Sequence, residues 1–453
     1  MGMHWLGAER ADDEEADSVT NAPGELWANW PRTARANPSS IVAPRVAEDV
    51  QQIVADAYAS GRHVRPVGAS HTSNALAAAP DVLLDARGLR GLNWIDLDSR
   101  EAAFGAGTTI AEAGALLESY GWQLENIPNN PAVTLGGAVA TGSHGTGARF
   151  ASLSSQLVSA TLVSGTGELV TVSAHQDLEL WPSVKLSLGA LGVFTELVFR
   201  IVPGYRIRTS AEEMRMSALV DEFEVLASGA DHFSASWRPH TDEVFVTQGF
   251  RESGEIADEP TPSRRSASFG ALGEVLAIGL SKSLPLLTPA VNRLANRVHP
   301  VGESTLGPMR ALAEPAPVRF ASLEYSFPIA ETPEVLRALD ETIERAHLNL
   351  PYAVRISTTA ADDACLSNAY RRAVGNIAVR VPSTLDARPI FTAAEDLFLR
   401  LGGLPHWGSF HTVRAEEFKH VITRFGDFHT ARERLDPAGV FDNAHLTRVL
   451  GAH

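Results

Sequence analysis

Two loops of small residues hold the densest set of possible ligand-binding groups in this chain of 453 residues. The first reads PVGASHT at 66–72, and the second reads TLGGAVATGSHGTG at 134–147. Because glycine has no side chain, backbone amides can approach a ligand there, and successive N–H groups form a concavity that binds anions. Both loops therefore favour a ligand with a diphosphate group. Neither is a GxGxxG or GxxxxGK[ST] fingerprint, since Gly105 and Gly107 lack a third glycine.

These two loops and three later segments occur in a characteristic order. NIPNNPAV precedes the second loop, and the later segments are SLGALGVFTELVFRIVP at 187–203, GGLPHWGSFHT at 402–412 and RLDPAGVFDNAHLTRVLG at 434–451. Together they resemble the vanillyl-alcohol-oxidase superfamily of FAD enzymes, and within it the sugar-lactone and alditol oxidases. The resemblance spans nearly the whole chain, and it implies that the diphosphate ligand is FAD.

The resemblance implies an α+β fold with a PCMH-type FAD-binding domain of two lobes at 28–205. A substrate domain with an antiparallel sheet flanked by helices is expected at 206–410. The C-terminal segment 411–453 is expected to return to the FAD-binding domain. Residues 1–27 are acidic and poor in apolar periodicity, so we expect them to be flexible.

Local patterns predict individual elements. Apolar residues three and four apart within 47–58 form one helical face. Thr109 and Glu112 form a capping box, and Gly121 suits the end of the same helix. Another helix is predicted to begin at Thr332. Strands are predicted at 82–84, 157–163, 168–172, 193–202, 233–237 and 244–246.

By resemblance, His71 is bonded covalently to the 8α-methyl group of the flavin, a bond that fixes the ring and raises its reduction potential. A hydrogen-bonding histidine beside non-covalent FAD is the alternative. His144, in the second loop, is assigned no chemistry. The expected cofactor-binding residues are Val67, Gly68, Ala69, Ser70, His71, Thr72, Thr134, Leu135, Gly136, Gly137, Thr141, Gly142, Ser143, Gly145, Thr146, Gly147, Val193, Asn443 and His445.

In the relatives, an arginine stands two residues after a glutamate on one strand, and a lysine ends an HWGK motif. Here Arg355 is kept, but Ala353 replaces the glutamate and Ser409 replaces the lysine. Residues two apart on a strand share a face, so Ala353 is expected where the carboxylate would be. We therefore expect a less charged pocket, with weak activity on simple alditols and better activity on a larger or less polar alcohol.

Oxidising an alcohol requires removal of the hydroxyl proton while hydride leaves carbon. Arg355 is suited to stabilise the developing alkoxide, and His406 or His411 to take the proton. Arg355, His406, Ser409 and His411 are thus the candidate catalytic residues. His240 and Glu324 are weaker candidates.

Composition excludes several other classes of function. The net charge is −16 and no cluster of Lys and Arg occurs, so no nucleic-acid partner is expected. Cys365 is the single cysteine, and no HExxH or EF-hand pattern occurs, so no disulfide and no metal are predicted. The most apolar run, 269–287, contains charges and a proline, so no membrane span is expected. The acidic beginning of the chain is unlike a secretory signal, which favours the cytoplasm.

The predicted function is an FAD-dependent oxidase. It would convert a hydroxyl of a sugar-like, polyol or related small-molecule alcohol to a carbonyl, with molecular oxygen as acceptor and hydrogen peroxide as product. A dehydrogenase of similar fold with a quinone or protein acceptor is one alternative. A flavin-binding protein without turnover is another, suggested by Ala353 and Ser409.

Overall fold

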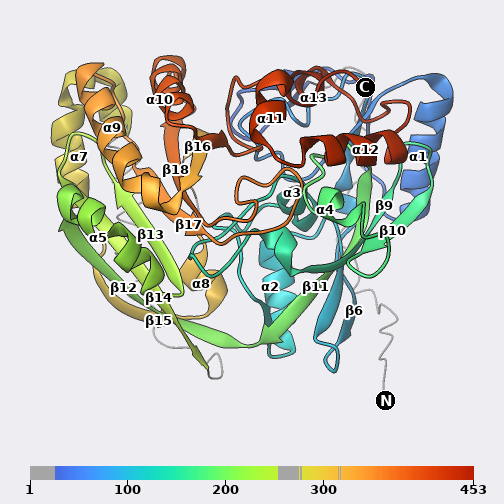
Figure 1. Cartoon of the computed structure of the whole chain (residues 1–453), viewed down its shortest axis with the longest axis horizontal. Helices are drawn as coiled ribbons and strands as arrows, with labels where there is room; N and C mark the ends of the chain where they lie inside the picture. The colour runs from blue at the N-terminus through green and yellow to red at the C-terminus, as the bar shows by residue number, and fades with distance from the viewer. Residues whose placement is uncertain (1–25, 254–274, 276–277, 315, 317) are drawn as a thin grey trace.

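The computed structural model of the protein describes residues 26–253, 275, 278–314, 316 and 318–453. These residues form two lobes that lie side by side (Figure 1). The chain passes from the first lobe to the second between β11 (Val193–Pro203) and β12 (Tyr205–Arg215). Both lobes combine helices and sheets, which confirms the α+β class. The acidic segment expected at 1–27 lies almost entirely outside the described residues.

A small parallel sheet in the first lobe leads into the first glycine loop. Its strands follow the order β3 (Ser40–Val42), β5 (Val82–Asp85) and β4 (Val64–Val67). Helix α1 (Ala47–Ser60) connects β3 to β4 and buries Val50, Val54 and Ala57, as its apolar spacing predicts. Nearby, β1 (Trp27–Ala28) pairs with β2 (Arg35–Ala36). The loop with His71 therefore begins on a strand held by its neighbour β5.

A larger antiparallel sheet forms the rest of the first lobe, with strands in the order β10, β9, β11, β7, β6, while β8 pairs with β11. Their bounds are Leu169–Ser173, Leu157–Val163, Val193–Pro203, Glu101–Gly105, Leu92–Asp96 and Trp122–Leu124. The predicted hairpin of β9 and β10 is confirmed. So is the capping box of Thr109 and Glu112 at the start of α2 (Ile110–Ser119). Helices α3 (Leu135–Ala140) and α4 (Trp181–Val184) complete this lobe.

The second lobe contains an antiparallel sheet in the order β15, β12, β14, β13, β17, β18, β16, β19. Their bounds are Gly302–Leu306, Tyr205–Arg215, Glu243–Ser253, His232–Trp237, Val354–Thr359, Val374–Pro382, Phe320–Pro328 and Leu404–Pro405. Helices α5 (Met216–Ser228), α9 (Thr332–Arg345) and α10 (Arg388–Arg400) pack on one face of it (Figure 1). Helices α7 (Thr288–Asn296) and α8 (Pro308–Leu312) lie between β14 and β16 in the sequence.

Alternation along the central strands separates the core of the second lobe from its functional face. On β17, Val354 and Ile356 belong to the hydrophobic core, whereas Arg355 and Ser357 line a cavity on the opposite face. The strands β16 and β18 alternate in the same way. Because successive side chains of a strand point to opposite faces, burial of one set fixes the direction of the other. Core packing therefore aims Arg355 at the first lobe.

The C-terminal segment packs on the first lobe through α11 (Ala415–Val421), α12 (Phe425–Leu435) and α13 (Ala444–Leu450). Phe418, Phe428 and Leu446 are fully buried in the same hydrophobic core as Phe104 and Leu197 of the antiparallel sheet. Figure 1 shows these three helices over the first lobe. Residues far apart in the sequence thus share one core.

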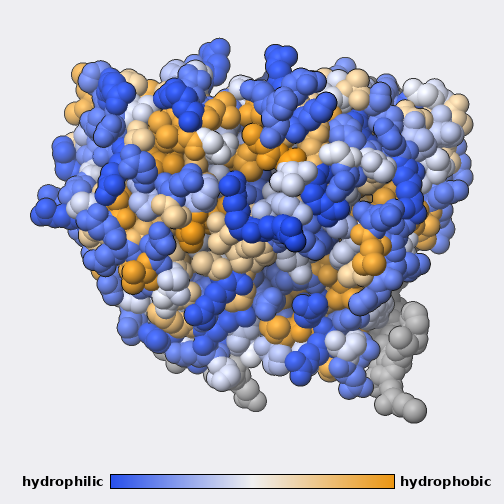
Figure 2. Space-filling view, viewed as in Figure 1, coloured by the Kyte–Doolittle hydropathy of each residue, from blue (hydrophilic) through white to orange (hydrophobic). Residues whose placement is uncertain are grey.

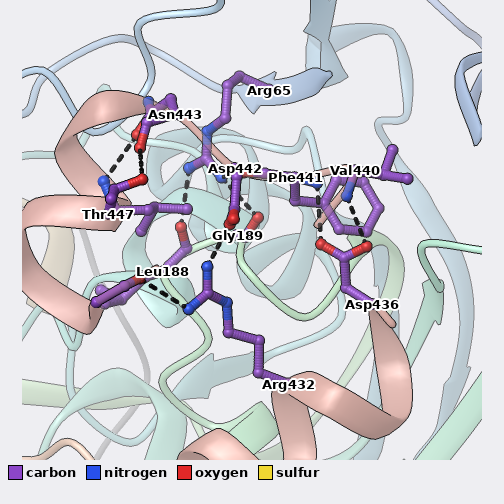
Figure 3. A network of polar contacts seen from close by, with 12 residues as sticks. Arg65, Leu188, Gly189, Arg432, Asp436, Val440, Phe441, Asp442, Asn443 and Thr447 are labelled. Carbon is purple, nitrogen blue, oxygen red and sulfur yellow. Dashed lines mark hydrogen bonds and ion pairs between the residues drawn. The ribbon is translucent and has the colours of Figure 1, made fainter. Parts of the chain in front are cut away.

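Figure 3 shows the polar contacts that hold this segment. The buried guanidinium of Arg65 donates to the carbonyl oxygens of Leu188 and Gly189 at 2.9 Å each, and to that of Phe441 at 2.6 Å. Burial lowers the pKa of Arg65 to about 10. Asn443 donates to backbone carbonyls of residues 75, 76 and 78 and caps α13. One arginine therefore joins the first loop, the 187–193 segment and the C-terminal segment.

Hydrophilic residues dominate the face in Figure 2, and hydrophobic residues form smaller groups, one of them at the top where the two lobes meet. Within the described ranges, each helix is too short or too polar to cross a bilayer.

Candidate active site

A single large cavity of about 350 Å³ joins the two lobes at their junction. The first and second glycine loops and residues 188–194 form its wall in the first lobe. Polar side chains of β16, β17 and β18 and the HWGS motif at 406–409 form its wall in the second lobe. One cavity is therefore lined both by the glycine loops and by the sheet of the second lobe, the kind of lobe junction where ligand sites occur.

Most of the residues predicted from the sequence line this cavity. They are Val67, Gly68, Ala69, Ser70, His71, Thr72, Thr134, Gly136, Gly137, Thr141, Ser143, Gly145, Val193, Arg355, His406 and Ser409. The structure does not place the others on its wall, namely Leu135, Gly142, Thr146, Gly147, His411, Asn443 and His445.

The predicted residues that do not line the cavity pack in the core or contact other segments, and these contacts depend on the tertiary structure. Leu135 is fully buried in the core of the first lobe. Thr146 contacts the His232 ring at 3.3 Å. Asn443 does not line the cavity. Its side-chain amide donates hydrogen bonds to the backbone carbonyls of residues 75 and 78, and so holds a segment that lies next to the cavity. Gly142 has a positive φ of 67°, and a Cβ built there would meet the Leu186 side chain.

Gly137 lies in a short helix within the second glycine loop. The segment LGGAVA is helix α3, capped by Thr134, and Gly137 is not among the residues with positive φ. Gly68 has the tighter environment, because a Cβ there would lie 3.2 Å from the Cβ of Thr134 and closer still to its Oγ1. The two glycine loops thus touch each other at Gly68, where no side chain fits.

His71 stands on the first loop in a defined environment. Ser70 before it has φ 58°, a strained left-handed conformation for a residue with a side chain. The His71 ring packs against Trp30 with centroids 4.8 Å apart, and its Nδ1 accepts a hydrogen bond from the Asn130 side chain at 3.1 Å. Burial lowers the pKa of His71 to about 4. The imidazole is therefore neutral and nucleophilic at pH 7.

The first loop is fastened to the HWGS motif of the other lobe. The Asn74 amide donates to the carbonyl oxygens of Trp407 and Ser409 at 2.8 Å each. The backbone N–H of Ser73 donates to the carbonyl of Gly408 at 2.7 Å. Any group held by His71 is thus kept in register with Ser409.

The wall of the first lobe fits an FAD. Its two loops consist mainly of small residues, so backbone amides can approach a diphosphate. Two buried oxygens of lining residues, Thr72 Oγ1 and Asn129 Oδ1, have no hydrogen-bond partner among the residues that the structure describes. Buried polar atoms are normally paired, so these two atoms are suited to bind polar groups of the cofactor. Arg65 also lines the cavity, but its donors are used by backbone carbonyls.

Charged side chains crowd the wall of the second lobe, although Ala353 and Ser409 stand at two positions where charges were sought. Arg355 forms an ion pair with Glu314, and Arg380 approaches the same carboxylate at 4.0 Å. Arg380 also lies over the rings of Phe320 and Tyr352. Ala353 is buried and does not line the cavity. Glu314, from the segment between α8 and β16, places a carboxylate beside Arg355.

His144 and Glu324 form the second charged pair on this wall. His144 Nε2 lies 2.8 Å from Glu324 Oε1, and His144 Nδ1 lies 3.0 Å from the carbonyl oxygen of Gly145. Burial alone lowers the pKa of His144, but the hydrogen bond and charge of Glu324 outweigh it and leave that pKa raised. The same pairing, against burial, lowers the pKa of Glu324 to about 2.

The two histidines expected as catalytic bases are placed differently. His406 lines the cavity, but its Nδ1 accepts from the Gly408 N–H at 3.1 Å and the ring also bonds the backbone of Gly142. Burial lowers its pKa. His411 packs against Trp407 and Phe418 away from the cavity, and burial places its pKa well below the ordinary value. Neither ring nitrogen of His411 has a hydrogen-bond partner within the described protein.

Some missed residues had a signal in the sequence, and others had none. Ser322 and Glu324 on β16 are two positions apart, and Asn376 and Arg380 on β18 are four positions apart with Ala378 between them, so the polar residues of each strand share one face. That alternation indicates one functional face. Glu314 lies outside any regular element, and only the tertiary structure brings it to Arg355.

The fold and the cavity define an FAD-dependent oxidoreductase of the PCMH type. Residues 38–173 match the FAD-binding domain family, and residues 197–449 match the D-arabinono-1,4-lactone oxidase family. The chain belongs to the D-arabinono-1,4-lactone oxidase family, and its cofactor is FAD.

Relatives extend the match over nearly the whole chain. The L-gulono-1,4-lactone dehydrogenase of Mycobacterium tuberculosis is 29% identical over 94% of this chain and 99% of its own length. The L-gulonolactone oxidase of Scyliorhinus torazame is 26% identical over 94% and 98%. A solved structure of a solvent-stable cholesterol oxidase superposes with a TM-score of 0.81, covering 94% of this chain and 97% of that one, at 17% identity. The last likeness concerns the fold.

Among the described residues, no group of three or more His, Cys, Asp or Glu side chains is arranged to hold a metal ion.

Proposed function

We propose that the protein oxidises a hydroxyl of a sugar 1,4-lactone to a carbonyl, with molecular oxygen as final acceptor and hydrogen peroxide as product. The observation that carries this proposal is one continuous cavity that joins the two FAD-binding loops to the arginine-bearing face of β17 and β18. The names of the relatives support the lactone as substrate class. This replaces the broader expectation of a polyol or a less polar alcohol.

The charges on the cavity wall favour an uncharged ring over an open-chain sugar acid. Glu314 and Glu324 both face the cavity, and each carboxylate repels the carboxylate that hydrolysis of a lactone creates. Arg355 and Arg380 offer donors to hydroxyl and carbonyl oxygens of the ring. Arg355 is placed to stabilise the negative charge that develops on the oxygen being oxidised. Bound FAD supplies the acceptor for the hydride.

Reduction of the bound flavin under anaerobic conditions tests this proposal. We expect L-gulono-1,4-lactone or D-arabinono-1,4-lactone to bleach the flavin absorbance, and the matching open-chain aldonates, sorbitol and xylitol to do so at least tenfold more slowly. Fast reduction by the alditols and not by the lactones would overturn the lactone assignment.

The acceptor is decided by a separate measurement. The relative from Mycobacterium tuberculosis is named a dehydrogenase, so an acceptor other than oxygen is the second candidate. Mixing the reduced protein with air-saturated buffer distinguishes them. Rapid reoxidation with stoichiometric peroxide supports the oxidase, whereas slow reoxidation that a quinone or cytochrome accelerates supports the dehydrogenase.

We also propose that His71 carries the FAD covalently. Its ring is neutral at pH 7 because burial lowers its pKa to about 4, and a neutral imidazole is nucleophilic. The wild-type protein is expected to keep flavin fluorescence on a denaturing gel after acid treatment, and His71→Ala is expected to lose it while still binding FAD. Release of all flavin from the wild type into the acid supernatant would disprove the bond.

A further inference from the structure

Two cavities meet at His144. The main cavity is lined by Glu324 and His144, and a small second cavity of about 30 Å³ is lined by His144, His406 and Asp362. Glu324 thus faces the substrate side, while His144 stands between the two cavities. An orienting group, a histidine and a carboxylate in hydrogen-bond contact are the parts from which enzymes build a general base.

The hydrogen bonds of His144 fix where its proton-accepting nitrogen points. The carbonyl oxygen of Gly145 can only accept, so Nδ1 of His144 carries a proton. In the neutral ring, the lone pair is therefore on Nε2, 2.8 Å from Glu324 Oε1. His406 offers no comparable site, since its Nδ1 is already bonded to the Gly408 N–H. Of the histidines on this wall, His144 has a nitrogen directed at a carboxylate that faces the substrate.

We propose that Glu324 and His144 act together as the general base of the oxidation. This inference rests on the proposed function. The substrate O–H bond breaks and its proton goes to the ionised Glu324 carboxylate, which passes that same proton on to the lone pair of His144 Nε2. The hydride leaves carbon with both C–H electrons to FAD, the oxidant of the proposed reaction, and the C=O bond forms. Glu324 ends ionised as it began, and His144 ends as an imidazolium.

The groups around the pair favour a proton held on His144. Glu324 and Asp362 act on His144, and His144, His406 and Arg380 act on Glu324. The two carboxylates raise the pKa of His144, and burial opposes them. Since only neutral His144 can accept, flavin reduction should speed up as pH rises through a midpoint above 6.5.

Histidine NMR titration of the holoenzyme tests the proton position without a substrate. The His144 signal is identified by its loss in His144→Gln. In the wild type we expect its midpoint above 6.5, and in Glu324→Gln below 6.5, because burial then acts without the carboxylate. An unchanged midpoint in Glu324→Gln would overturn the proposal. The NMR titration needs no substrate, so it still tests the pair if no lactone reduces the wild-type flavin. Failure of every lactone to reduce the flavin would count against the proposed function, and not against the position of the proton.

Single-turnover flavin reduction by L-gulono-1,4-lactone between pH 6 and 9 tests the catalytic role. The wild-type rate should rise with pH and then level off. In Glu324→Gln and His144→Gln it should be at least tenfold lower and flat. Glu324→Asp, which keeps the charge on a shorter stem, should keep the pH dependence. If Glu324→Gln and His144→Gln lose rate equally but keep the wild-type pH profile, the pair has only a structural role and the proposal is wrong.

The matched control is a second histidine–glutamate pair outside the cavity. His240 Nδ1 lies 2.7 Å from Glu344 Oε1 and its Nε2 lies 2.9 Å from the carbonyl oxygen of Leu348. Neither residue lines the main cavity, so the structure leaves His240, a weaker candidate from the sequence, outside the catalytic site. His240→Gln should leave the rate and the pH profile unchanged. A loss as large as that of His144→Gln would overturn the special role of the cavity pair.

Discussion

Replacing Gly68 with valine is expected to abolish FAD binding. A Cβ at this position would lie 3.2 Å from the Cβ of Thr134 and closer to its Oγ1, so the two glycine loops could not meet. Thr134 is buried and caps α3, and it cannot withdraw without disturbing that helix. The obstacle is space and not backbone strain, because Gly68 is not among the residues with positive φ. The ratio of flavin to protein absorbance after purification measures the loss.

Gly426→Val is the matched control for this experiment. No atom lies within 4 Å of a Cβ built at Gly426, and its φ is not positive. This variant should retain the wild-type FAD content. Circular dichroism of Gly68→Val separates a folded apoprotein from an unfolded chain. A normal FAD content in Gly68→Val would show that the two loops can separate without losing the cofactor.

Replacing Arg355 with alanine is expected to slow flavin reduction by about a hundredfold or more, the usual scale for losing one transition-state donor. β17 directs the guanidinium into the cavity because Val354 and Ile356 on either side of it are buried in the core. The loss should fall mainly on the limiting rate and less on the substrate concentration at half-maximal rate. Stopped-flow reduction at varied lactone concentration separates the two quantities.

Arg337→Ala is the control for loss of an arginine. Arg337 is half exposed on α9, where it pairs with Asp221 and Glu334. Such surface pairs contribute little, so flavin reduction should be unchanged. Full activity in Arg355→Ala would contradict the assignment of a transition-state donor, and the oxygen would then have to be stabilised by another group.

Much of the fold followed from local sequence. The capping box of Thr109 and Glu112, the helix after Thr332 and the hairpin of β9 and β10 are confirmed. These features depend on residues within a few positions of one another, so a pattern in the sequence carries the whole physical cause. The helix in LGGAVA was missed because glycine is a poor helix former, and tertiary packing outweighs that preference.

The candidate site also contains residues that the sequence predicted and residues that only the tertiary structure revealed. The sequence predicted the two glycine loops, His71, Arg355 and the HWGS motif, and these residues meet at one cavity. It predicted His411 as a base, but the ring packs against Trp407 and Phe418 and does not line the cavity. It assigned nothing to His144, whose partner Glu324 is 180 positions away in the chain.

By itself, the sequence determined the family and the cofactor, and it predicted the two loops that line the cavity, since these rest on motifs of short spacing. Only the tertiary structure decided which charges face the cavity. Glu314 reaches Arg355, and His144 reaches Glu324, across the junction of segments distant in the chain. The physical reason is that the energy of an ion pair depends on the distance between the charges in space and on their burial. Alternation along a strand predicts which face of the sheet a side chain lies on, but it does not predict which residue of another segment lies opposite.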